Sequence, residues 1–249
     1  MTSAIMQPTF IPWIGYFDMI DKVDHFIFLD HVQLTKRSWQ VRNRIKTSQG
    51  ETFITIPILK NKSRSDLCIK DAIISYNDNW DKKFLKTLEQ YYKKADHFKE
   101  VFEWLEKIIN QRTKTLGALN ITIIKDISKR IGITTNMYTS SDLHSTKVKD
   151  EMLVELIKEI DCDNYLSAQG SSVYIELNSP GGYFTKNNIE LYYHNYEHPN
   201  YEQGKNSFLP YMAIIDLLMN IGFDNALNVI KQGRKPDIHY KEYREKMNL

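Results

Sequence analysis

The stretch that decides the fold covers residues 4–45 and reads AIMQPTFIPWIGYFDMIDKVDHFIFLDHVQLTKRSWQVRNRI. A short apolar run, 4–6, comes first. A helix is expected to begin near Pro12, because proline is tolerated in a first helical turn, where its missing N–H would have no partner. The apolar run 26–29 then has the length of a strand. A strand, a helix and a strand within about 30 residues predict a βαβ unit and hence an α/β fold with a mainly parallel, Rossmann-like sheet.

The remainder of the chain extends this pattern. Residues 80–131 contain apolar side chains at helical spacing and predict a helical block inserted between two α/β parts. Further strands are expected at 51–58, 67–75, 133–137, 165–167 and 189–194, and further helices at 147–160, 172–177, 210–220 and 223–231. We therefore expect one α/β domain over 1–231 and a charged C-terminal tail over 232–249.

Composition sets broad limits. The chain has 249 residues, and its 33 Lys and Arg residues nearly balance 31 Asp and Glu residues, so the overall charge does not favour a nucleic-acid partner. The two cysteines have no metal-ligand spacing. The sequence shows neither an apolar run of membrane-spanning length nor a signal-peptide pattern, and we expect a cytoplasmic protein.

No zinc, dinucleotide-binding, P-loop or α/β-hydrolase motif is present, and no metal site is predicted. The segment Pro12–Tyr16 resembles the helix entry of nucleotidyltransferases of the HIGH type. It has the glycine of that motif at Gly15 but neither histidine. A shared fold is therefore an alternative, whereas the histidines that would stabilise a phosphate are absent.

Polar residues follow the first two predicted strands. Gln7 and Pro8 come after the first strand, and Asp30, His31 and Gln33 come after the second. Ligands of open parallel sheets bind beyond the carboxyl ends of the strands, so these two loops are expected to face one crevice. The next segment interleaves charge, amide and aromatic side chains at Arg37, Trp39, Arg42 and Asn43. A solvated surface loop is the simple interpretation, but arginine beside tryptophan also suits recognition of a phosphate or carboxylate.

Several segments together resemble the WbqC-like family, which is associated with bacterial gene clusters for O-antigen and other surface glycans. These segments are QPTFIPWIGYF, DKVDHFIFLDHVQ, KRSWQVRNRI, DNYLSAQGSSVYI and FLPYMAIIDLLMNIG. The resemblance implies transfer of glycine, or more broadly an acyl group, onto an amino sugar. It also implies a role in lipopolysaccharide precursor synthesis.

We therefore predict a transferase that attaches an acyl or aminoacyl group to the amine of a nucleotide-linked amino sugar. Asp30 and His31 are the candidates for the base that accepts the proton of the amine. The predicted substrate-binding residues are Gln7, Pro8, Trp13, Tyr16, Gln33, Arg37, Trp39, Arg42, Asn43, Lys147, Tyr165, Ser167, Gly170 and Tyr201. Asp216 lies in an apolar helix and needs a partner if it is buried, for which Arg42 or Arg44 is the candidate.

Two other function classes stay open. The lack of an evident nucleophile fits a non-catalytic protein that binds a sugar nucleotide or assists glycan assembly. The basic stretch 36–46 fits nucleic-acid binding, and tRNA or an acyl carrier is a candidate donor of the transferred group. Neither the donor nor a cofactor can be read from the sequence, and a homo-oligomer is a further open alternative.

Overall fold

The computed structural model describes residues 1–35, 37–59, 67–204 and 207–248. Within these residues, six strands form one sheet in the order β5-β2-β1-β6-β7-β8. The strands are β1 (Thr2–Met6), β2 (His25–Phe28), β5 (Asn136–Thr139), β6 (Asn164–Ala168), β7 (Glu190–His194) and β8 (Ile238–His239). All neighbours are parallel except β7 and β8. The mainly parallel α/β fold predicted from the sequence is confirmed.

The strand order contains a switch point beside β1. The chain moves from β1 to β2 and β5 on one side, and from β6 to β7 on the other. The two loops that leave β1 and β6 therefore diverge, which opens a crevice at the carboxyl ends of these two central strands. Ligands of doubly wound sheets bind at such a position.

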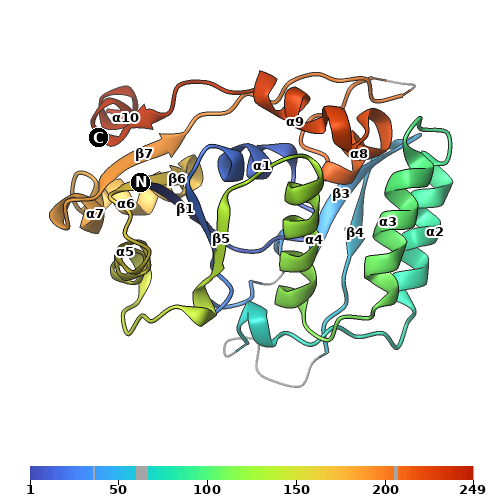
Figure 1. The fold of residues 1–249 in the computed structure, drawn as a ribbon, viewed down its shortest axis with the longest axis horizontal. Coiled ribbons are helices and arrows are strands. Elements are labelled where there is room, and N and C mark those ends of the chain that lie inside the picture. The colour runs from blue at the N-terminus through green and yellow to red at the C-terminus, as the bar shows by residue number, and fades with distance from the viewer. Residues whose placement is uncertain (36, 60–66, 205–206, 249) are drawn as a thin grey trace.

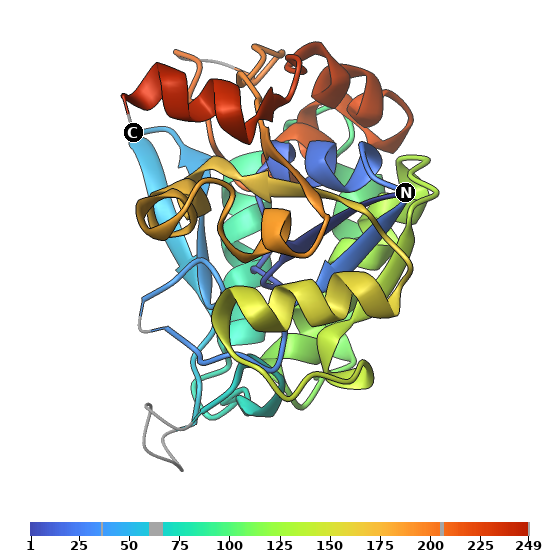
Figure 2. The same ribbon diagram turned by 90° about the vertical axis from the view of Figure 1, so that its left-hand side faces the viewer.

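Helices cover both faces of the sheet, because successive strand side chains point to opposite faces. Ala4 and Phe26 face one core, which also contains side chains of α1 (Ile14–Asp21), α4 (Leu116–Arg130), α8 (Ile214–Ile221) and α9 (Phe223–Gln232). Ile5 and Ile27 face the other core, formed with α5 (Lys149–Glu159), α6 (Ser172–Asn178), α7 (Gly182–Lys186) and α10 (Tyr240–Met247). Figure 2 shows α5 and α10 on the side of this second core.

The helical block predicted at 80–131 consists of α2 (Trp80–Tyr92), α3 (Phe98–Asn110) and α4. Figure 1 shows α2 and α3 side by side at one end of the molecule, with both chain termini at the other end. Helix α4 packs on the sheet and leads into β5, so it also serves as the crossover between β2 and β5. In the part of the chain that the structure describes, no helix is both long and apolar enough to span a bilayer.

Strands β3 (Arg42–Thr47) and β4 (Gly50–Thr55) form a separate antiparallel hairpin that we did not predict from the sequence. They pair Arg42 with Thr55 and Thr47 with Gly50. We had predicted the second of these strands but had interpreted 36–46 as a basic loop. Lys36 itself lies outside the described residues.

The strand predicted at 67–75 is wrong. This segment contains the short 3₁₀ turn η2 (Ile69–Asp71), and its backbone pairs with the residues that follow β2. Ile69 N donates to Val32 O at 3.1 Å, and Lys70 N donates to Asp30 O at 2.9 Å. Leu67 and Ile69 are buried. The residues after β2, with which this segment pairs, are not a regular strand, so no continuous row of β-sheet hydrogen bonds forms.

The charged segment at 232–249 forms structure where we expected a tail. It contains β8 and α10, and buried ion pairs tie it to the sheet and to α1. Asp18, which is fully buried, accepts hydrogen bonds from His194 Nε2 at 2.7 Å and from Arg234 Nε at 2.5 Å. Arg244 Nη1 lies 3.1 Å from the buried carboxylate of Glu176. A buried carboxylate needs such partners, and two of them, Arg234 and Arg244, come from the segment that we had expected to be a tail.

Asp216 does not pair with Arg42 or Arg44, contrary to our expectation. Its carboxylate accepts hydrogen bonds of 2.7 Å from Tyr92 Oη, Tyr201 Oη and Gln203 Nε2. Burial raises the pKa of Asp216, while these hydrogen bonds act in the opposite direction. The carboxylate thus joins α8 to α2 and to the 201–203 segment.

Replacement of Asp216 by alanine should therefore lower the free energy of unfolding by at least about 3 kcal/mol, because three buried donors would lose their acceptor at about 1–3 kcal/mol each. Asp224→Ala is the matched control, since Asp224 also lies in a first helical turn but is exposed. That control should cost less than about 1 kcal/mol. The free energies of unfolding are measured by urea denaturation. If Asp216→Ala lowers this free energy no more than Asp224→Ala does, the hydrogen-bonded cluster around Asp216 contributes little to stability.

Candidate functional site

A cavity of about 280 Å³ opens beside the carboxyl end of β1, next to the switch point of the sheet. Aromatic rings and one guanidinium group dominate its walls. The lining residues are Met6, Thr9, Pro12, Trp13, Tyr16, Trp39, Asn43, Arg44 and Tyr211. Such walls suit a sugar or another ring that stacks on aromatic faces, with the cation available to a negatively charged group.

Two buried asparagine amides hold the cavity open by fixing the loop that follows β1. Asn43 Nδ2 donates to Phe10 O at 3.0 Å and to Ile11 O at 2.8 Å. Asn120 Nδ2, on α4, donates to Pro8 O at 3.0 Å and to Gln40 O at 2.9 Å. The loop 7–11 and the segment 38–43 are therefore fastened to each other and to α4. Asn43 lines the cavity, but its amide nitrogen is engaged by this loop.

Gln40 connects the same two segments through its side chain. Its Nε2 donates to Gln7 Oε1, while its Oε1 accepts from Ser38 Oγ at 2.6 Å and from Thr35 N at 3.1 Å. The amide oxygen of Gln7 is thus engaged within the protein. Neither Gln7 nor Pro8 lines the cavity. Their hydrogen bonds to Gln40 and Asn120 instead hold the segments that form its wall.

The indole of Trp13 forms the inner wall and lies over Gly15. A Cβ atom at Gly15 would come within 2.2 Å of the indole ring. The ring also contacts Tyr211 and Tyr196, with centroid distances of 5.5 and 5.6 Å. The glycine therefore leaves room for a side chain of the protein itself. This arrangement weighs against the nucleotidyltransferase alternative, in which the ligand would need that space.

Asp30 is buried, and its carboxylate is engaged by residues that follow β5. Its Oδ1 accepts from Ser140 Oγ and from Ser141 N, both at 3.0 Å, and its Oδ2 accepts from Ser141 Oγ at 2.9 Å. These serines belong to η3 (Ser140–Asp142), which follows β5. The carboxylate therefore joins the carboxyl ends of β2 and β5.

His31 is linked to Asp30 through Ser140. The Oγ of Ser140 accepts from Asp30 N at 3.0 Å and lies 2.6 Å from His31 Nδ1. When the hydroxyl hydrogen of Ser140 is directed to Asp30, Nδ1 of His31 is the donor in the second contact. Nε2 then carries a lone pair, and it lies 3.0 Å from Met152 Sδ. Burial lowers the pKa of His31, so the ring is neutral near pH 7.

Comparison with known proteins covers most of the chain. The WbqC-like protein family matches residues 7–227, a span that includes every wall of the cavity except Met6. The chain belongs to the WbqC-like protein family. It is similar to the "Uncharacterized protein Rv1507c" of Mycobacterium tuberculosis (strain ATCC 25618 / H37Rv), with 36% identity over 221 residues, which cover 88% of this chain and 93% of the relative. No solved structure matches the chain.

Other predicted site residues of this WbqC-like protein lie away from the cavity. Tyr165 is buried in the core on the opposite face of the sheet and stacks on Phe184 at 4.8 Å. Tyr201 donates its hydroxyl to Asp216. These tyrosines do not line the cavity, because strand alternation directs the first to the α5 side and the carboxylate engages the second.

The remaining predicted residues occupy three places. Ser167 Oγ and Ser171 Oγ are 2.5 Å apart at the end of β6, and Gly170 is exposed in the turn η4 (Gln169–Ser171). Lys147 is exposed before α5, with its Nζ 4.0 Å from Glu151. Gln33 forms an isolated backbone bridge with Cys68, and Arg37 is exposed with a φ of 54°. None of these five lines the cavity.

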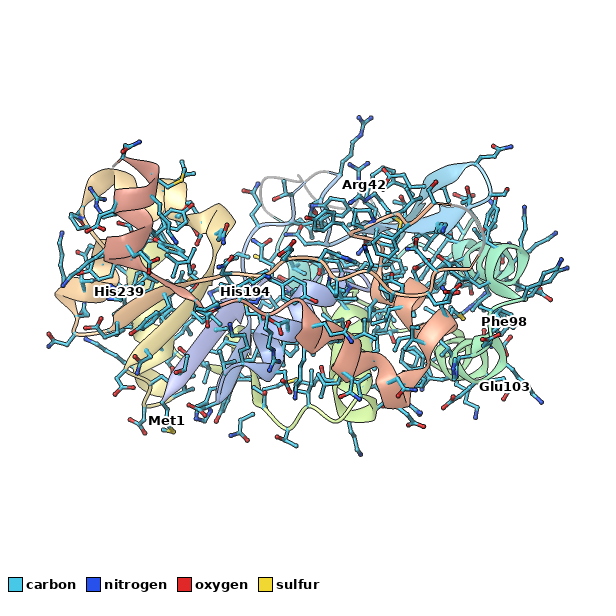
Figure 3. The ribbon with its side chains drawn as sticks, turned by 90° about the horizontal axis from the view of Figure 1, so that it is seen from above. Met1, Arg42, Phe98, Glu103, His194 and His239 are labelled. Atoms are coloured by element: carbon cyan, nitrogen blue, oxygen red, sulfur yellow. The ribbon has the colours of Figure 1, made fainter. Side chains whose placement is uncertain are left out.

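Arg42 begins β3, two residues before the cavity residue Arg44. Figure 3 labels Arg42 at the upper edge of the view, apart from His194, at the end of β7, and Phe98, at the start of α3. Its guanidinium lies 4.4 Å above the ring of Phe53. Arg42 is thus part of the hairpin surface beside the cavity.

Five cavity residues were not predicted from the sequence, namely Met6, Thr9, Pro12, Arg44 and Tyr211. A signal for Arg44 was available, because the alternation of residues 42–47 would have shown Arg42 and Arg44 on one face of a strand. Tyr211 had no such signal. Its φ of 62° is rare for a residue with a side chain, and Ile11 in the loop after β1 has a φ of 35°. Strained backbone of this kind is concentrated at functional sites.

Gly15→Ala should displace the indole of Trp13 from the cavity wall. Alanine is the better helix former, yet the overlap with the ring should lower the free energy of unfolding by about 1–3 kcal/mol. Gly170→Ala is the matched control, since a Cβ there meets no atom within 4 Å. Chemical denaturation and a crystal structure of each variant would test this, and an unmoved indole in a stable Gly15→Ala protein would contradict it.

Proposed function

We propose that this WbqC-like protein transfers an acyl or aminoacyl group, glycyl among the candidates, to the amine of a nucleotide-linked amino sugar during O-antigen or related surface-glycan biosynthesis. The cavity at the switch point is the observation that carries the proposal. Trp13, Trp39 and Tyr211 supply aromatic faces for a sugar ring, and Arg44 supplies a cation for the phosphate side of the substrate. The chain belongs to the WbqC-like protein family, and the association with surface-glycan gene clusters is what the sequence resemblance implies.

In this reaction the amine nitrogen attacks the acyl carbon of an activated ester or thioester. A C–N bond forms, the bond to the leaving group breaks, and a proton passes from the amine to a base. His31 does not line the cavity, but it is our candidate for this base, because burial lowers its pKa and its Nε2 lies against the soft sulfur of Met152. A methionine side chain has three flexible torsions and can move aside for substrate. Asp30 acts through Ser140 as a positioning residue that keeps the proton of His31 on Nδ1.

The activity is tested by incubating the protein with nucleotide-linked sugars that carry a free amine. Acyl-coenzyme A, acyl-carrier-protein thioesters and glycyl-tRNA serve as separate donors. We expect loss of the primary amine together with the mass gain of one acyl group for one combination. Tight binding of an amino-sugar nucleotide without amine loss from any donor would instead favour the alternative of a non-catalytic binding protein.

Given an active combination, His31→Ala should lower turnover by about 10²–10⁴-fold while substrate binding stays close to normal. Asp30→Asn should have a smaller effect, since it changes only the support of the base. The rate should fall as the pH drops through the pKa of His31, which burial holds below its ordinary value of 6.5, because protonation removes the lone pair that accepts the proton. His144→Ala is the control, as that side chain is 97% exposed. Full turnover in His31→Ala would remove this residue from the mechanism.

A further inference from the structure

A row of stacked aromatic and guanidinium groups runs from the cavity onto the β3–β4 hairpin. The guanidinium of Arg44 lies 5.5 Å from the ring centre of Trp39, and both residues line the cavity. Trp39 is 6.2 Å from Phe53, with an angle of 31° between the ring planes. The guanidinium of Arg42 then covers Phe53. We call these four residues, Arg44, Trp39, Phe53 and Arg42, the hairpin ladder.

The rings of the ladder are open to solvent to an unusual degree. Trp39 is 49% exposed and Phe53 is 46% exposed, although both are large apolar side chains. The two rings are tilted by 31° relative to each other and present exposed π-faces flanked by positive charge. Successive bases or nucleotides stack on surfaces of this composition without strict preference for one base.

The two arginines of the ladder retain unused hydrogen-bond donors. The Nε atoms of Arg42 and Arg44 are buried and have no partner among the described residues. Arg44 contacts Glu51 Oε2 at 2.8 Å through Nη1 and donates to Tyr211 O at 3.3 Å through Nη2, whereas Arg42 forms no ion pair within the described part of the chain. An arginine held against an aromatic face and lacking an acidic partner is preorganised for an external anion such as a phosphate.

The size of the cavity requires part of a large ligand to lie outside it. Its volume of about 280 Å³ lies just below the roughly 300–1,000 Å³ of pockets that enclose drug-sized ligands. A sugar ring fits such a space, but a sugar joined to two phosphates, a ribose and a base exceeds it. The half-exposed residues Trp39 and Tyr211 mark the side from which the ligand would project.

We propose that the hairpin ladder is the nucleoside-diphosphate subsite of this protein, an inference that rests on the proposed function. The base stacks on Trp39 and Phe53, and the diphosphate accepts hydrogen bonds from Arg42 and Arg44. The sugar with its amine enters the cavity between Trp13 and Tyr211. The nucleotide thus orients the substrate with the amino sugar directed toward the ends of the parallel strands.

Titration calorimetry with UDP, dTDP and GDP, none of which carries a sugar, tests this assignment. At least one of these probes should bind, and Phe53→Ala and Arg42→Ala should each raise its Kd by about tenfold or more. Arg42→Lys should weaken binding less than alanine, because it keeps the charge but loses the planar fork. Arg130→Ala is the control, since Arg130 also covers an aromatic ring, that of Phe223 at 5.2 Å, but lies on α4 away from the hairpin. It should leave the Kd unchanged.

The same titrations separate the subsite from the function. Normal binding of the diphosphate by folded Phe53→Ala and Arg42→Ala proteins overturns the subsite, while amine transfer by the wild-type protein still supports the proposed function. Binding of a nucleotide-linked amino sugar without binding of any nucleoside diphosphate also overturns the subsite alone. Should a single-stranded oligonucleotide bind more tightly than the diphosphates and depend on the ladder, the surface is a nucleic-acid site and the inference is wrong. Failure of every nucleotide and sugar nucleotide to bind overturns both proposals.

Discussion

The cavity depends on two buried side-chain amides that fasten one loop to another. Asn43 and Asn120 satisfy four carbonyl groups of the segments that follow β1 and precede β3. Buried carbonyl groups without partners would each cost free energy, so these hydrogen bonds make the irregular backbone tolerable inside the protein. Because the two segments are held at fixed positions, Trp13 on one and Trp39 on the other face a common space.

Many polar residues near the strand ends serve the same structural purpose. Asp30 joins β2 to η3, Asp18 joins α1 to β7 and the C-terminal segment, and Asp216 joins α8 to α2. Each carboxylate is buried and each accepts hydrogen bonds from elements distant in the sequence. The cavity walls themselves consist mainly of aromatic rings and the guanidinium group of Arg44.

Buried carboxylates join the elements of the fold, and aromatic and guanidinium groups line the cavity. This arrangement fits a protein whose substrate has a large nonreactive part. In the proposed function, stacking and phosphate contacts at the hairpin would supply binding energy, whereas the cavity would orient the reacting end. Remote binding energy of this kind can hold an amine in a position where a single weak base suffices. A site that lacks a strong nucleophile is therefore compatible with transfer from an already activated donor.

The sequence by itself determined the parallel α/β core, the helical block and the family, because these depend on local periodicity and on long motifs. Residues such as Trp13 and Trp39 were also recognised as ligand-binding candidates from their polar surroundings. Only the tertiary structure decided which of the polar candidates are engaged by partners of their own. Tyr201 and Asp30 have contacts with residues 15 and 110 positions away, and such distances leave no pattern in a single sequence. The same holds for Tyr211, which reaches the cavity because Ala213 N pairs with Arg44 O of β3 and draws this segment against the hairpin.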